Sequence, residues 1–100
     1  MNIAANLKAI DCIKADILAE VAELYKRLAD YDEISDYSPV ENSLSTIIAM
    51  SYILAKHLGI SHGTVDTRIS DLLTMAEENS HPLEKEFRDM SELNRYIRNR

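Results

Sequence analysis

The scarcity of helix-breaking residues constrains the fold more than any other feature of the sequence. The chain of 100 residues contains two glycines and two prolines, and no stretch alternates regularly between polar and apolar residues. Alternation indicates strands, whereas the apolar residues here recur at steps of three and four, which indicates helices. We therefore predict an all-α fold of three main helices plus a short C-terminal helix, in a single domain spanning residues 1–100.

The first predicted helix runs from Asn2 or Ile3 to Asp30 and carries an apolar seam. The residues of this seam are Ile3, Leu7, Ile10, Ile17, Val21, Leu24 and Leu28. A seam of this kind requires a packed partner helix. Residues 30–38, DYDEISDYS, interrupt the pattern with four carboxylates and are predicted to form a loop.

The second predicted helix has signals at both ends. Ser38 is the expected N-cap, Pro39 the first helical residue, and Glu41 the acid of a capping box. At the other end, Gly59 is expected to adopt the left-handed conformation that follows a helix C-terminus, with Lys56 in the last turn. These signals fix a helix of about twenty residues.

The same helix is apolar on more than one side, which indicates burial on more than one side. One face consists of Val40, Leu44, Ile47, Ile48, Leu54, Ala55 and Leu58. Met50 and Ile53 lie outside that face, and we expect them to contact another subunit. Because a small domain gains stability by burying apolar surface against a partner chain, we expect a dimer or larger homo-oligomer that completes the core.

The rest of the chain is predicted to form a third helix and a short helical tail. Ser61 can cap the third helix, which continues towards Asn79, and residues 80–82 interrupt it. A helical turn is expected around residues 83–87. A final helix follows Asp89, where the sequence DMSE has the pattern of a capping box.

Charge and cysteine content limit the classes of function. The formal net charge of −6 disfavours binding to nucleic acid, whose phosphates the average field repels. Arg95, Arg98 and Arg100 are expected to complement the dipole of a helix C-terminus. Cys12 is the only cysteine, so no intrachain disulfide can form and a reduced, cytoplasmic setting is expected.

The sequence shows neither a signal peptide at its start nor an apolar run long enough to cross a bilayer. The first ten residues, MNIAANLKAI, have no basic flank, continuous apolar core or cleavage site. The longest apolar run, residues 47–55, is interrupted by Ser51 and followed by Lys56. We therefore expect a protein without a membrane partner.

Four charged residues of the first helix form one strip because their steps of four, three and four return to the same side. They are Asp16, Glu20, Glu23 and Arg27. Two carboxylates three residues apart, Glu20 and Glu23, can share a hard cation such as Mg²⁺, and Asp16, Asp11 or a carboxylate from another subunit could add a further oxygen ligand. The alternative is a solvated acidic face capped by Arg27.

Three segments together resemble the small MazG-like proteins, relatives of the all-α nucleoside triphosphate pyrophosphohydrolases. The segments are ILAEVAELYKRL, LSTIIAMSYILAKHLGIS and LEKEFRDMSELNRYI, so the resemblance covers almost the whole chain. It implies a four-helix core built by dimers or larger assemblies. It also implies Mg²⁺ held between an ExxE box and an ExxD box, against the triphosphate of a nucleotide.

The resemblance places the first box on Glu20 and Glu23 and the second on Ser43 and Thr46, neither of which is a carboxylate. Glu41 points away from the missing ligand position and is a poor substitute. A cation held by two carboxylates instead of four binds more weakly. If active, the chain would hydrolyse a nucleoside triphosphate to monophosphate and pyrophosphate; if inactive, it would bind nucleotides or act as an interaction module.

A second resemblance concerns residues 55–70, AKHLGISHGTVDTRIS, which are similar to the helix-turn-helix of sigma-factor-like and response-regulator domains. In such a DNA-binding regulator Thr64, Asp66, Thr67 and Arg68 would face the groove. Asp66 has the wrong sign for that position, and the chain lacks a basic stripe. We retain this as the alternative function.

Overall fold

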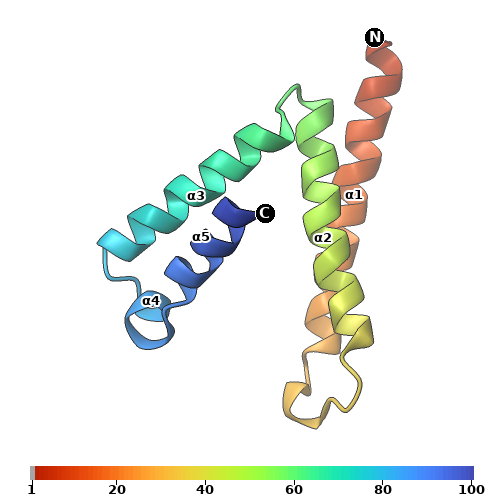
Figure 1. Ribbon diagram of the computed structural model, residues 1–100. Helices are drawn as coiled ribbons and strands as arrows, with labels where there is room; N and C mark the ends of the chain where they lie inside the picture. Colours follow the sequence, from red (N-terminus) through yellow and green to blue (C-terminus); the bar gives the residue numbers. More distant parts are fainter. Residues whose placement is uncertain (1) are drawn as a thin grey trace. The chain divides into compact units, whose positions relative to one another are not determined.

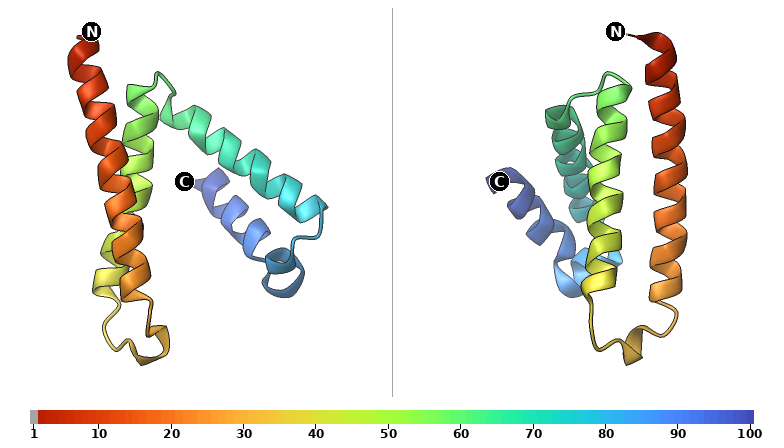
Figure 2. Two further views of the ribbon diagram at one scale, coloured as in Figure 1. Left: turned by 180° about the vertical axis from the view of Figure 1, so that it is seen from behind. Right: turned by 90° about the vertical axis from the view of Figure 1, so that its right-hand side faces the viewer.

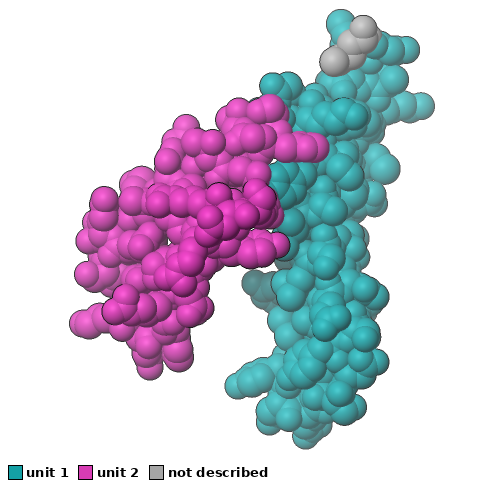
Figure 3. Space-filling view, viewed as in Figure 1, with its two compact units in different colours: residues 1–60 teal, residues 61–100 magenta. Residues whose placement is uncertain are grey.

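The computed structural model describes residues 2–100, and this range is helical with no strand (Figure 1). The elements are α1 (Ile3–Arg27), the 3₁₀ turn η1 (Tyr31–Glu33), α2 (Ser38–His57), α3 (His62–Glu78), α4 (Pro82–Phe87) and α5 (Asp89–Asn99). The all-α prediction is confirmed. The chain divides into two compact units, residues 1–60 and residues 61–100 (Figure 3), and each is described by itself.

The first unit is a hairpin in which α1 and α2 lie side by side and antiparallel, as both views of Figure 2 show. The buried stripe of α1 recurs at alternating steps of four and three residues. Its members are Asn6, Ile10, Ile13, Ile17, Glu20, Leu24 and Arg27. Three of these seven side chains are polar, and one is a cation.

This stripe agrees with the predicted apolar seam only in part. Ile10, Ile17, Val21 and Leu24 are half-buried or buried as expected, but Ile3, Leu7 and Leu28 are exposed. The prediction was wrong at these three positions because it followed apolar residues alone. The helix in fact turns a polar residue, Asn6, towards α2, and there the apolar pattern no longer marks the packed side.

The facing stripe of α2 has the same spacing and also contains polar residues. Its members are Val40, Ser43, Ile47, Met50, Leu54 and His57. Met50, which the sequence placed outside the apolar face, is half-buried and shares the spacing of the stripe facing α1, and its contact with another subunit stays a prediction. Ile53 is exposed, as are Leu44 and Ile48 from the predicted apolar face.

The two ends of α2 differ in how well they follow the prediction. Gly59 has a φ of 79°, and the Ile60 N–H donates to the Ala55 carbonyl at 2.8 Å, so the left-handed C-terminal turn is confirmed. The Ser38 N-cap is wrong, because Ser38 is already helical and no side chain caps the helix there. Instead the Asp36 carboxylate accepts the Ser38 N–H at 3.0 Å, and this bond lowers the pKa of Asp36.

The start of α1 is capped by Asn2, whose side chain accepts the Ala5 N–H at 3.0 Å. The helix ends at Arg27 rather than at the predicted Asp30. The last residues of the predicted helix instead enter the acidic loop, where η1 forms.

The second unit pairs α3 with α5 and places the short α4 between them in the chain. The Ser61 cap of α3 is confirmed, since its hydroxyl accepts the Thr64 N–H at 3.0 Å. The predicted capping box at the start of α5 is wrong: Asp89 is already helical. Glu84 of α4 caps the helix instead, since its carboxylate accepts the Ser91 N–H at 2.8 Å and the Ser91 hydroxyl at 2.9 Å.

Candidate functional site

The candidate site lies in the α1–α2 hairpin, near the end where the acidic loop joins the two helices. Glu20, Glu23 and Arg27 come from the last two turns of α1, and their spacing of three and four residues places them on one side of the helix. All three side chains are partly buried: 26% of Glu20, 41% of Glu23 and 33% of Arg27 remain exposed. The strip is thus part of the helix pair and not only a solvated face.

Arg27 forms ion pairs with both carboxylates. Its Nη1 lies 3.7 Å from Glu20 Oε1, and its Nε lies 3.6 Å from Glu23 Oε1. Glu23 has a second cationic neighbour, because Lys26 Nζ lies 3.6 Å from its Oε2. Lys26 is mostly exposed, so water screens this second pair more strongly.

The same guanidinium also reaches the first two turns of α2. Arg27 Nη1 donates to the Pro39 carbonyl at 2.7 Å and to the Ser43 hydroxyl. Ser43 is fully buried, and a buried hydroxyl needs a hydrogen-bond partner. Arg27 therefore links the two carboxylates of α1 to a buried polar residue of α2.

The two residues of the predicted second metal box, Ser43 and Thr46, lie in different environments. Ser43 joins the cluster through Arg27, whereas Thr46 is exposed on α2. Asp16, the expected additional ligand, is exposed and accepts a weak, long hydrogen bond from the Cys12 thiol at 3.9 Å. Across residues 2–100 no three His, Cys, Asp or Glu side chains gather closely enough to hold a metal ion.

Arg27 is the central residue of the site, and the sequence analysis gave it only the minor role of capping an acidic face. The spacing of the charged residues was the one sequence signal of this central role. Arg27 follows Glu20 by seven residues and Glu23 by four, so it shares their side of α1. In the structure it falls in the stripe that packs against α2.

A second polar pair joins the opposite end of the same hairpin. Asn6 Nδ2 donates to the His57 carbonyl at 3.0 Å, and Asn6 Oδ1 lies 2.7 Å from His57 Nδ1. Both residues belong to the buried stripes. Polar pairs at the two ends of a helix pair select one register over its neighbours.

The family of the chain follows from a comparison with models of known protein families. A model of the MazG-like family matches residues 3–90, which include the whole hairpin and most of the second unit. The chain belongs to the MazG-like family. Neither the curated proteins nor the solved structures contain a significant match to this MazG-like chain.

The family match agrees with the hairpin and gives no support to the helix-turn-helix alternative. Two residues expected to face the groove have partners within the second unit. The Thr64 hydroxyl lies 2.8 Å from the Ser61 hydroxyl, and Asp66 Oδ1 accepts from Arg100 Nη2 at 2.7 Å. No helix within residues 2–100 is both long and apolar enough to span a membrane.

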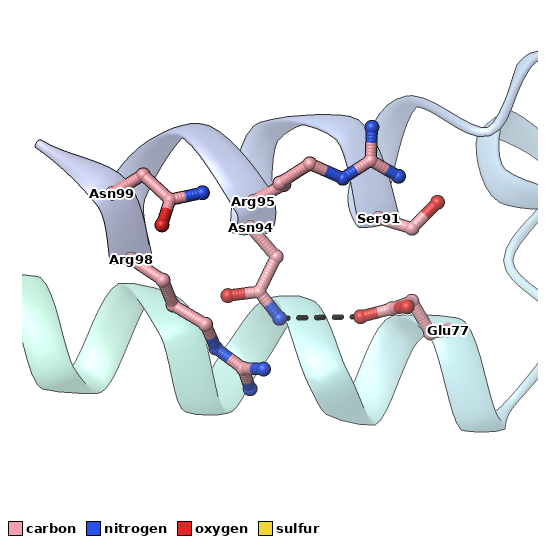
Figure 4. Close-up of a pocket in the computed structure, with 6 residues that line it drawn as sticks. All are labelled: Glu77, Ser91, Asn94, Arg95, Arg98 and Asn99. Atoms are coloured by element: carbon pink, nitrogen blue, oxygen red, sulfur yellow. Dashed lines mark hydrogen bonds between the residues drawn. The ribbon is translucent and has the colours of Figure 1, made fainter.

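The second unit contains a polar pocket between α3 and α5, shown in Figure 4. Its lining residues are Glu77, Ser91, Asn94, Arg95, Arg98 and Asn99. Asn94 is buried at its base and donates to Glu77 Oε2 at 3.2 Å, the bond drawn in the figure. The sequence analysis assigned no role to Asn94.

Proposed function

We propose that this MazG-like chain acts as a homo-oligomeric interaction module and does not carry out the magnesium-dependent pyrophosphohydrolysis that its family resemblance implies. The observation that carries this proposal is the pairing of Glu20 and Glu23 with Arg27. A residue of the chain already provides the positive charge at the position where the family would place a metal ion.

The residues of the site do not fit a resident magnesium ion. Mg²⁺ requires a nearly octahedral set of oxygen ligands, usually one or two carboxylates together with waters and substrate phosphates. Here two carboxylates face one guanidinium, and the nearby residue of the second box is the hydroxyl of Ser43. A divalent ion added at this point would be repelled by the positive charge of the Arg27 guanidinium.

The apolar surface of the hairpin supports the proposed assembly. The buried apolar residues of the described chain are Ile13, Leu24, Val40 and Ala55, a small core for two helices of this length. Large apolar side chains remain exposed on α1 and α2, including Leu18, Tyr25, Leu44, Ile48 and Ile53. Since two helices alone bury too little surface, a second copy that covers these side chains would complete the core.

Pyrophosphate release tests the functional proposal. The purified chain is incubated with a panel of canonical and modified nucleoside triphosphates in the presence of Mg²⁺ or Mn²⁺. We expect no release above the background given by a Glu20→Gln, Glu23→Gln double variant. Turnover by the unmodified chain that disappears in the double variant would overturn the proposal.

A further inference from the structure

We infer that the Arg27 guanidinium is a built-in substitute for a metal ion: it holds α1 to α2, and it masks a latent divalent-cation site formed by Glu20 and Glu23. The inference deepens the proposed function and rests on it, because it names the cause of the missing hydrolysis. It concerns how the site is held together, which can be measured without any substrate.

The first step is the position of Arg27. A metal between two acidic boxes would contact ligands from both helices at once. Arg27 does the same with its own donors, since it approaches Glu20 and Glu23 on α1 and donates to Ser43 on α2. Ser43 is the residue that the family resemblance aligns with a metal ligand, so one cation contacts both boxes.

The second step is charge. Glu20 and Glu23 are partly buried carboxylates on neighbouring turns, and without a counter-ion they repel each other. Lys26 offsets only the outer oxygen of Glu23 and is mostly exposed. Removing the Arg27 charge would leave two partly buried carboxylates facing α2, an arrangement that attracts a divalent cation.

The third step is hydrogen bonding. Ser43 is fully buried, and Arg27 is the donor that reaches its hydroxyl and the Pro39 carbonyl together. Loss of the guanidinium therefore removes contacts within α1 and contacts between the helices. Lys26 carries the same charge on the adjacent residue, yet the described contact of its side chain, the ion pair with Glu23, stays within α1. It provides the matched control.

Thermal unfolding with and without metal tests the inference. The variants are Arg27→Gln and Lys26→Gln, measured in chelated buffer and in millimolar Mn²⁺. We expect Arg27→Gln to unfold several degrees below the parent chain in chelated buffer, and Lys26→Gln to unfold close to it. Mn²⁺ should raise the unfolding temperature of Arg27→Gln and leave the parent and Lys26→Gln unchanged.

Two further variants keep the test decisive if Arg27→Gln does not fold. The double variant Arg27→Gln, Ser43→Glu adds a third carboxylate, and we expect it to fold only when Mn²⁺ is present or to gain more from Mn²⁺ than the single variant. Arg27→Lys keeps a cation, and we expect it to fold and to remain insensitive to Mn²⁺.

Four results would overturn the inference: equal unfolding temperatures for Arg27→Gln and Lys26→Gln, no response of either Arg27→Gln variant to Mn²⁺, stabilisation of folded Arg27→Lys by Mn²⁺, or stabilisation of the parent chain by Mn²⁺. None of these concerns pyrophosphate release. Failure of the inference is therefore distinguishable from failure of the proposed function, which either turnover by the parent chain or a monomeric parent chain would overturn.

Discussion

Asn94 in the second unit shows how one buried polar residue can connect two helices. It is 4% exposed; its Oδ1 accepts from Ser70 at 2.7 Å, and its Nδ2 donates to Thr74 at 3.1 Å and to Glu77 at 3.2 Å. All three partners lie on α3. The amide thus fixes α5 against α3 by satisfying polar groups that water reaches poorly.

Replacing Asn94 by alanine should destabilise the folded chain by about 1–3 kcal/mol, because its half-buried partners on α3 lose the hydrogen bonds of the buried amide. Urea unfolding followed by circular dichroism measures this difference. The control is Asn99→Ala, since Asn99 lies on the same helix and is exposed. Equal stability of the two variants would show that the network contributes nothing.

The burial of the polar residues in the stripes of α1 and α2 could not be predicted from the sequence. The apolar spacing correctly predicted Ile10, Ile17 and Leu24 as packed positions. It could not indicate that Asn6 and Arg27 face α2, because a polar side chain is ordinarily assigned to solvent. Whether it is buried depends on a partner from another helix, which the local pattern does not contain.

At the scale of the elements, the two glycines of the chain should respond oppositely to the same change. Gly59 has a φ of 79°, whereas Gly63 is an ordinary helical residue in the first turn of α3. We expect Gly59→Ala to destabilise by about 1–2 kcal/mol, since a side chain is strained in the left-handed region. Gly63→Ala should stabilise by up to about 1 kcal/mol.

Thermal unfolding of the two alanine variants measures whether their stabilities change in opposite directions. Neither added methyl group meets a close neighbour, since nothing lies within 4 Å at Gly59 and the Ser61 hydroxyl lies 3.9 Å away at Gly63. Steric overlap therefore does not confuse the comparison. A stabilised Gly59→Ala variant would contradict the left-handed turn after α2.

The cap that α4 provides for α5 should make the second unit sensitive to acid. The backbone N–H of Ser91 lowers the pKa of Glu84 from its ordinary value of 4.5. A carboxylate whose pKa is lowered by folding stabilises the folded state above its unfolded pKa, and this stabilisation is lost as the pH falls through the lowered folded pKa. The contribution of Glu84 is thus complete at neutral pH and declines below about pH 4.5.

Unfolding temperatures measured from pH 7 to pH 3 test this linkage. Glu84→Gln should be less stable than the parent chain at pH 7, and the difference should shrink as the pH falls below 4.5. Glu86→Gln is the control, because Glu86 is an exposed residue of the same helix. A stability difference for Glu84→Gln that does not change with pH would contradict the assigned role.

Helix-end signals in the sequence were reliable where few residue types can serve the position. They were less reliable where several nearby residues could cap the helix. Gly59 and the Ser61 cap were predicted correctly because few residues serve those positions. The starts of α2 and α5 were not, because Asp36 and Glu84 provide the acceptors from outside the expected capping position. A capping pattern in sequence does not reveal which nearby carboxylate reaches the free N–H groups.

At the scale of the whole molecule, the proposed assembly depends on the exposed apolar side chains of the hairpin. Ile48 is 57% exposed on α2 and lies one turn from Leu44. We expect Ile48→Glu to shift the chain from oligomer to monomer at micromolar concentration, because a charge in an apolar interface is costly to desolvate. Asn42→Glu, an exposed polar position on another side of α2, should leave assembly unchanged.

Sedimentation velocity distinguishes these outcomes. A parent chain that is monomeric at micromolar concentration would contradict the proposed assembly, and dissociation by both variants would show that charge alone is responsible. Ile53, expected from sequence to contact another subunit, is 41% exposed and remains a candidate for the same interface. Ile53→Glu extends the test to that side of α2.

The central claim is that Arg27 takes the place of a metal ion between Glu20 and Glu23, and calorimetric titration of Mn²⁺ into the unmodified chain tests it most directly. We predict no saturable heat at micromolar to millimolar Mn²⁺, the same result as for the Glu20→Gln, Glu23→Gln double variant. Saturable binding by the unmodified chain that disappears in the double variant would contradict the claim.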